Sequence, residues 1–71
     1  MEYPKTQRIT DLSSTSTEVH NLMHGLRGIQ ATAERVGNEQ AYSEATLWLR
    51  SASDLYDSIN VALQREQSSD A

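Results

Sequence analysis

Two runs of apolar residues, separated only by Gly37-Asn38, constrain what this 71-residue chain can fold into. Within each run the apolar residues recur every three or four positions, a spacing that predicts a helix and suits neither a strand nor a loop. A connection of two residues forces neighbouring helices to be antiparallel, so the sequence predicts an all-α fold built on a helical hairpin. The first run comprises Val19, Leu22, Met23, Leu26, Ile29, Ala33 and Val36, and the second Ala41, Ala45, Trp48, Ala52, Leu55, Ile59 and Ala62.

Local signals set the expected boundaries within a single domain spanning 1–71. Residues 1–14 are polar, contain the only proline and predict an irregular N-terminal arm. The segment Thr15-Ser16-Thr17-Glu18 matches a capping box, which starts the first helix and gives it the range 15–37. Gly37 suits a left-handed helix end and Asn38 suits a helix start, so the second helix is expected over 38–67. Residues 68–71 are expected to fray.

The composition leaves this chain with little to hold it together. Only 37% of its residues are hydrophobic, below the usual range of about 45–50%. It has no cysteine, which excludes disulfides, thiolate metal sites and a cysteine nucleophile. A core this small barely offsets the conformational entropy of folding. Association of several copies is therefore the first expectation.

The second helix carries more apolar residues than one partner helix can cover. Tyr42 begins a row that recurs every seven residues, and Leu47 and Val61 lie nearly opposite the main stripe. If these side chains stayed exposed to solvent, a small monomer would carry an unusually large apolar patch, so we expect a helical oligomer. In the alternative, Ile9 and Leu12 of a folded-back arm cover one stripe of a monomer. The expected oligomer interface comprises Tyr42, Leu47, Trp48, Leu49, Tyr56, Val61 and Leu63.

Charge and hydropathy limit the partners. A formal net charge of −4 argues against long nucleic acid and against an anionic membrane surface, because both reward dense positive charge. No apolar run approaches the roughly 20 residues of a membrane span, and residues 1–9 lack the apolar region of a signal peptide. We therefore expect no membrane partner and a cytoplasmic location.

The sequence offers no catalytic constellation. His20 and His24 share a helix face but lack the further ligands that a metal site needs. Asp54 and Asp57 are spaced like ordinary solvated acids on a polar helix face. The serines do not lie in a strand–turn–helix nucleophile elbow. We expect no enzyme, no metal site and no cofactor.

Cationic and hydrogen-bonding groups are concentrated at one place on the first helix. His20, His24 and Arg27 form one stripe there. Gly25 and Gly28 flank Arg27 and weaken the helix, which indicates close approach by another helix or by a ligand. A small phosphorylated anion needs only a few cationic donors and an aromatic face, which the arm can supply unless it is simply solvated. The candidate ligand-binding residues are Tyr3, Lys5, Arg8, His24 and Arg27.

The second helix also resembles a known family. Its segments Trp48-Leu49-x-x-Ala52 and Ala62-Leu63-x-Arg65 match the pattern W-L-x-x-A, an apolar stretch and then A-L-x-R. This pattern is similar to the last helix of the phage anti-CBASS and anti-Thoeris cyclic-nucleotide sponges of the helical hairpin type. The run from Leu22 to Arg27 resembles one that ends, in that family, in a ligand-contacting lysine.

The resemblance implies a function. It points to a phage anti-defence protein in the host bacterial cytoplasm, a multimer whose protomer interfaces hold a cyclic di- or trinucleotide immune signal. Such a protein sequesters its ligand without cleaving it and needs no catalytic group. The alternative from the residues themselves is a small acidic protein-interaction module, such as an inhibitor, an antitoxin-like partner or an assembly adaptor, acting through an apolar helix face.

Overall fold

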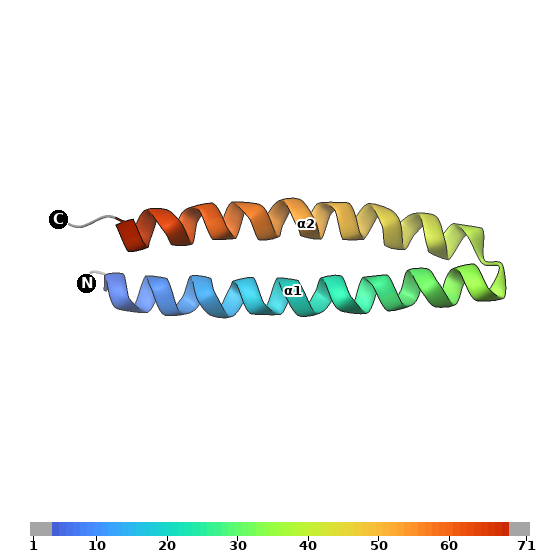
Figure 1. Cartoon of the computed structure of the whole chain (residues 1–71), viewed down its shortest axis with the longest axis horizontal. Coiled ribbons are helices and arrows are strands. Elements are labelled where there is room, and N and C mark those ends of the chain that lie inside the picture. Colours follow the sequence, from blue (N-terminus) through green and yellow to red (C-terminus); the bar gives the residue numbers. More distant parts are fainter. Residues whose placement is uncertain (1–3, 69–71) are drawn as a thin grey trace.

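The chain forms a helical hairpin. The computed structural model describes residues 4–68, and these form two helices, α1 (Lys5–Val36) and α2 (Glu39–Ser68), which lie antiparallel along their whole length (Figure 1). The molecule measures 54 × 18 × 14 Å. The predicted all-α hairpin is therefore confirmed, whereas its assembly into an oligomer stays a prediction. The expected frayed tail over 68–71 is wrong for Ser68, which belongs to α2, and Tyr3 and residues 69–71 lie outside the described residues.

The expected irregular arm is wrong for residues 5–14, because α1 begins at Lys5, directly after Pro4. The supposed capping box lies well inside this helix. There the Thr15 hydroxyl donates a hydrogen bond to the Asp11 carbonyl (2.8 Å), and the Thr17 hydroxyl donates to the Ser13 carbonyl (3.2 Å). These bonds satisfy the hydroxyls within the helix, so Thr15 does not act as a cap.

The connection between the helices follows the sequence prediction. Gly37 adopts the left-handed conformation (φ 75°), and its N–H donates to the Glu34 carbonyl. The Asn38 N–H donates to the Ala33 carbonyl, which completes a Schellman-type helix end. The Asn38 side-chain oxygen then accepts a hydrogen bond from the Ala41 N–H (3.0 Å) and caps α2.

One seam between the helices forms the core. Its alanines let the two backbones approach closely, while Leu12, Leu49 and Tyr56 pack against its edges. The contact of Leu12 with this core favours helix in the residues before Thr15, where α1 extends back to Lys5. The buried residues are Ser16, Val19, Met23, Leu26 and Ala33 of α1 and Ala45, Ala52 and Ile59 of α2.

Three polar contacts between the helices fix their register. The Arg8 Nε lies 2.7 Å from a Glu66 carboxylate oxygen. The Ser16 hydroxyl donates to the Asn60 side-chain oxygen (3.1 Å), and the Gln30 amide donates to the Thr46 hydroxyl (2.9 Å). In each pair the two residue numbers add up to 74 or 76. A residue of α1 therefore lies beside the residue of α2 whose number is close to 76 minus its own.

Candidate functional site

About half of the large apolar side chains in the two predicted runs remain exposed in the hairpin. Trp48, the largest of them, is 66% exposed, and the others are each half exposed or more. Each predicted run, with its spacing of three and four residues, therefore contains two neighbouring rows of apolar residues. The other helix of the hairpin covers only one of these rows. The exposed members are Leu22, Ile29 and Val36 of α1 and Trp48 and Leu55 of α2.

These side chains form one continuous surface across both helices. On α1 they recur every seven residues, so they lie on one side of that helix, and Trp48 and Leu55 share a side of α2 for the same reason. The register places Leu22 level with Leu55 and Ile29 level with Trp48. A hollow lined by Ile29 and Val36 together with Ala41 shows that the rows of both helices meet on one face. We call this surface the apolar face; it comprises Leu22, Ile29, Val36, Ala41, Trp48 and Leu55.

The residues expected at an oligomer interface do not share one surface. Tyr42, Leu47, Trp48 and Val61 are exposed, whereas Leu49, Tyr56 and Leu63 are half-buried. Leu49 and Tyr56 pack against the core of their own hairpin, which is why the row that begins at Tyr42 is not free as a whole. Leu47 and Val61 lie on the side of α2 that faces away from α1. Trp48 is thus the one predicted interface residue on the apolar face.

Glycine 25 lies between Leu22 and Ile29 and lines the same hollow, as does Gly28. A Cβ atom added at either glycine would meet nothing within 4 Å, and neither glycine has a positive φ. The hairpin itself therefore does not require glycine at these positions. Two glycines inside a helix lower its stability, and no contact within the described residues explains why they are present in α1.

A second hollow, with both polar and apolar lining, contains two arginines. It is bordered by Arg27 of α1 and Arg50 of α2, and its other lining residues are Met23, Thr46, Leu49, Ser53 and Asp54. Among residues 4–68, neither arginine takes part in a hydrogen bond or an ion pair. Two guanidinium groups from two helices can bind one anion, although the Asp54 carboxylate at the same hollow opposes it.

The two histidines pack with an aromatic ring. The His20 ring lies 4.7 Å from the His24 ring, edge to face, and 5.8 Å from the Tyr56 ring across the helix interface. His20 therefore covers the outer side of Tyr56. In the part of the chain that the structure describes, no group of three His, Cys, Asp or Glu residues could hold a metal ion.

The predicted ligand-binding residues are not brought together within one chain. His24 and Arg27 share a side of α1, but Arg8 lies about 28 Å from Arg27 along the helix, at 1.5 Å per residue. Lys5 is farther still, and the Arg8 guanidinium is paired with Glu66. The expectation that an arm closes over Arg27 is wrong for Lys5 and Arg8, because both belong to the helix. Tyr3 lies outside the described residues.

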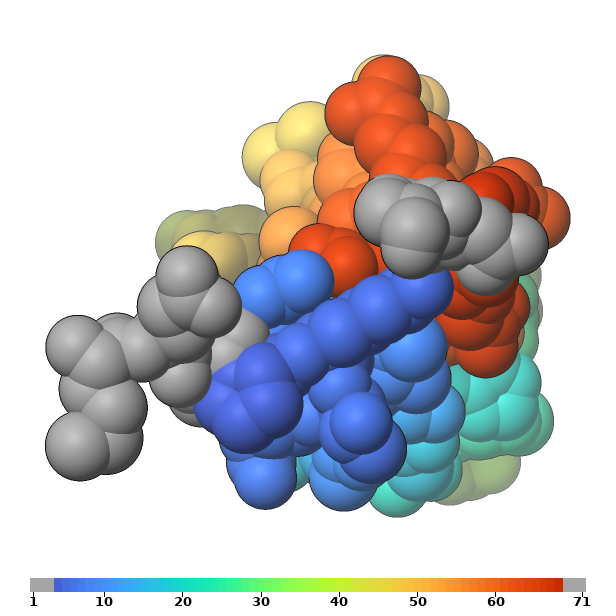
Figure 2. Space-filling view, turned by 90° about the vertical axis from the view of Figure 1, so that its left-hand side faces the viewer, coloured from blue at the N-terminus to red at the C-terminus, as the bar shows by residue number. Residues whose placement is uncertain are grey.

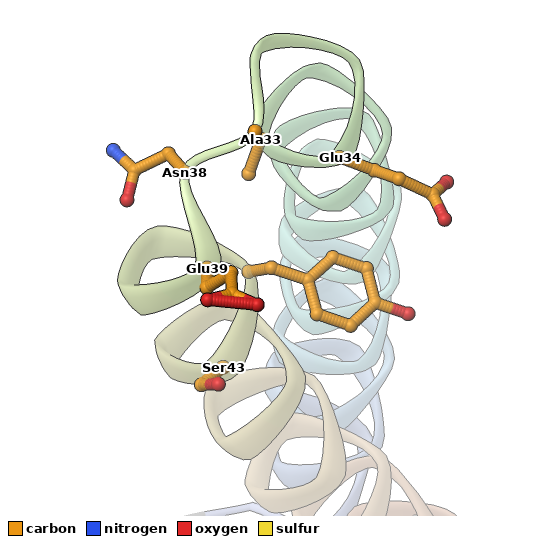
Figure 3. A pocket seen from close by; sticks show the side chains of 7 residues that line it. Ala33, Glu34, Asn38, Glu39 and Ser43 are labelled. Carbon is orange, nitrogen blue, oxygen red and sulfur yellow. The ribbon is translucent and has the colours of Figure 1, made fainter.

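A further hollow lies at the connection between the helices, bordered by Ala33, Glu34, Asn38, Glu39 and Ser43 among others. Figure 3 shows the Glu34 and Asn38 side chains pointing to opposite sides, away from the hollow. The Asn38 side chain is also engaged in capping α2. Polar groups do not converge there, so the hollow offers no arrangement for chemistry.

No protein-family model, curated protein or solved structure matches this chain. Across the described residues, neither helix combines the length and apolar character that crossing a bilayer requires. Within residues 4–68, the apolar face and the hollow between Arg27 and Arg50 are the features on which a function can be proposed.

Proposed function

We propose that this chain is a non-catalytic interaction module that works by association through its apolar face. The observation that carries the proposal is the alignment of Leu22 with Leu55 and of Ile29 with Trp48 across the two helices, all of them half exposed or more. Scattered exposed apolar residues need no explanation, but a contiguous patch on so small a molecule marks an interaction surface.

Burial of these exposed side chains by a partner would contribute a free energy that is large for a 71-residue chain. Complete burial of a leucine or isoleucine side chain contributes roughly 1.5–3 kcal/mol, and each of these side chains is only partly covered in the hairpin. A partner that covers five of them offsets the thin core of the hairpin. Such burial would add to the stability that the hairpin core already gives two helices of 32 and 30 residues.

The proposal is tested by sedimentation of fluorescently labelled chain added to a lysate of its source cells. Wild type should sediment well above its own mass of 7.9 kDa. Leu55→Asp should return the labelled chain to that mass without loss of helicity, because Leu55 is half exposed in the hairpin. The matched control is Ala31→Asp, which places the same charge at an exposed position away from the apolar face. Equal sedimentation of wild type and Leu55→Asp would contradict the proposal.

A second candidate function is sequestration of a cyclic di- or trinucleotide in a bacterial host, as the sponge resemblance implies. The specific observation in its favour is that two guanidinium groups with no partner among residues 4–68, those of Arg27 and Arg50, border one hollow. Thr46 and Ser53 add hydroxyl groups there, so phosphate oxygens would find several donors. Sequestration works by mass action and requires no catalytic group.

Calorimetry and thermal shift with cyclic di- and trinucleotides test this second function. Binding at 100 times Kd would stabilise the chain by about 2.7 kcal/mol. Arg27→Ala should abolish binding and leave helicity unchanged, whereas Arg35→Ala, whose guanidinium bonds Thr32 elsewhere on α1, should bind as wild type does. Absence of heat with every cyclic nucleotide at micromolar chain concentration would remove this function and leave the interaction module standing.

A further inference from the structure

We infer that the occupant of the apolar face is a second copy of this chain, packed so that both helix connections lie at the same end. In this arrangement α1 of each copy packs on α2 of the other and the pair forms a four-helix bundle. The inference rests on the proposed function and adds to it the identity and the orientation of the partner.

The apolar pattern is typical of helices with two neighbours. The core seam uses two positions in every seven, such as Val19 and Met23 on α1. In the half of the hairpin nearest the connection, the apolar face adds a third position in every seven on both helices, such as Leu22 and Leu55. A two-helix contact needs only two apolar positions in seven, whereas helices facing the core of a bundle use three. The third position lies on the same side of both helices, so one flat partner made of two helices covers both rows.

The broad side of the hairpin that carries the apolar face has the size that a stable dimer needs. The two helices lie side by side in the view along the shortest axis, so each broad face of the hairpin measures 54 by 18 Å (Figure 1). A standard interface covers about 800 Å² on each partner. Full overlap of two such faces therefore provides enough contact without any further protein.

The proposed pairing places Trp48 of one copy over the hollow at Gly25 of the other. By the register of the hairpin, Trp48 is level with residues 28 and 29 of α1. When both connections lie at one end, α2 faces α1 of the second copy at the same level. Trp48 then lies over the hollow between Gly25 and Ile29 of that copy, where a Cβ atom would find open space. This contact gives both the exposed tryptophan and the unexplained glycine a physical role.

The opposite orientation fits poorly. Asp11 and Glu18 continue the row of Gly25 by steps of seven toward the N-terminus. If the connections lie at opposite ends and the copies overlap fully, α1 packs on α1 of the second copy. The Asp11 carboxylate then lies at the level of Ile29 of that copy, and the Glu18 carboxylate at the level of Leu22. With the connections together, Asp11 instead faces Arg65 of the second copy. Arg65 lies at the surface beside Leu12 and Ala62, and among the described residues no ion pair engages it.

Sedimentation equilibrium of the purified chain tests the pairing. Wild type should weigh twice 7.9 kDa at micromolar concentration and dissociate on dilution. Gly25→Gln should raise the dissociation constant at least tenfold while leaving helicity intact, because a Cβ atom there meets nothing within 4 Å in its own hairpin and the longer side chain occupies the hollow. The matched control, Ala31→Gln on the polar side of α1, should pair as wild type does. Unchanged pairing of Gly25→Gln would overturn the inference.

Spin labels test the orientation. The chain has no cysteine, so Thr6→Cys provides a single labelling site at the exposed far end of α1. With the connections together, the two labels should lie within about 30 Å, since neighbouring helices pack 8–10 Å apart. With the connections opposed they would lie roughly 45 Å apart or more, at 1.5 Å per residue. The long distance would overturn the proposed orientation.

The outcomes separate this inference from the proposed function. A purified chain that is helical but monomeric at every concentration overturns the pairing. If that same chain, labelled, still forms a Leu55-dependent complex in lysate, the interaction module stands with a different partner. If the lysate complex is absent as well, both proposals fail. A dimer that is sensitive to Gly25→Gln and has a short label distance supports both.

Discussion

The Arg8 guanidinium contacts both carboxylate oxygens of Glu66, with Nε 2.7 Å from Oε1 and Nη2 3.3 Å from Oε2. This two-point contact joins the first turns of α1 to the last turns of α2, which lie together at one end of the molecule (Figure 2). Both side chains are only partly exposed, 41% and 25%. The contact closes the end of the hairpin that the covalent connection leaves open.

Loss of this ion pair should loosen that end alone. Glu66→Gln should lower the free energy of unfolding by about 0.2–1 kcal/mol, the range measured for ion pairs that solvent can reach. Amide hydrogen exchange should accelerate in the first two turns of α1 and leave the region near Gly37 unchanged. Asp57→Asn, at an exposed position, removes the same charge and should have no such effect. Equal exchange in both variants would contradict a local role for the pair.

Glycine 37 should be far more sensitive than the glycines inside α1. Gly37→Ala forces a Cβ into the left-handed region, at a cost of about 1–2 kcal/mol. In a chain of this size each kcal/mol lowers Tm by roughly 4–8 °C. Gly28→Ala should instead gain about 0.5–1 kcal/mol, because its backbone is helical and a Cβ meets open space. Denaturant unfolding at one chain concentration measures both, and a loss of stability in Gly28→Ala would contradict the expected signs.

The buried Ser16 hydroxyl should be coupled energetically to Asn60. A double-mutant cycle of Ser16→Ala and Asn60→Ala cancels the different helix propensities of the single variants and leaves the contact itself. A hydrogen bond of 3.1 Å between half-buried neutral groups predicts a coupling of about 0.5–1.5 kcal/mol. The control cycle pairs Asn60→Ala with Thr17→Ala, whose hydroxyl bonds Ser13 within its own helix. Similar coupling in both cycles would contradict the register contact.

The hairpin and its connection could be predicted because their signals are local. Gly37 and Asn38 act through their own backbone and side chain, and both predicted caps are present. The start of α1 could not be found in this way. The hydroxyl residues before Val19 suit a cap or a helix interior equally well, and the choice depends on the contact of Leu12 with the core.

The surfaces were harder to predict than the helices. Apolar residues three and four apart define a broad stripe, and the sequence does not say which part of it the single partner helix covers. Ile29 and Trp48 are therefore exposed although they belong to the predicted runs, while Leu49 and Tyr56 pack within the hairpin. The row of apolar residues seven apart, from Leu22 to Val36, was the signal that could have identified the apolar face. The candidate ligand residues Lys5 and Arg8 depended on an irregular arm, and this segment is instead helical.

Trp48 tests the central claim most directly, because it is the only tryptophan in the chain and lies on the apolar face. Its emission maximum and its quenching by acrylamide should be measured from nanomolar to high micromolar chain concentration, alongside helicity. If copies cover the apolar face, emission should shift to the blue and quenching should fall as concentration rises, and Gly25→Gln should move this transition to higher concentration. A fully helical chain whose Trp48 stays equally accessible to acrylamide at every concentration would contradict the account.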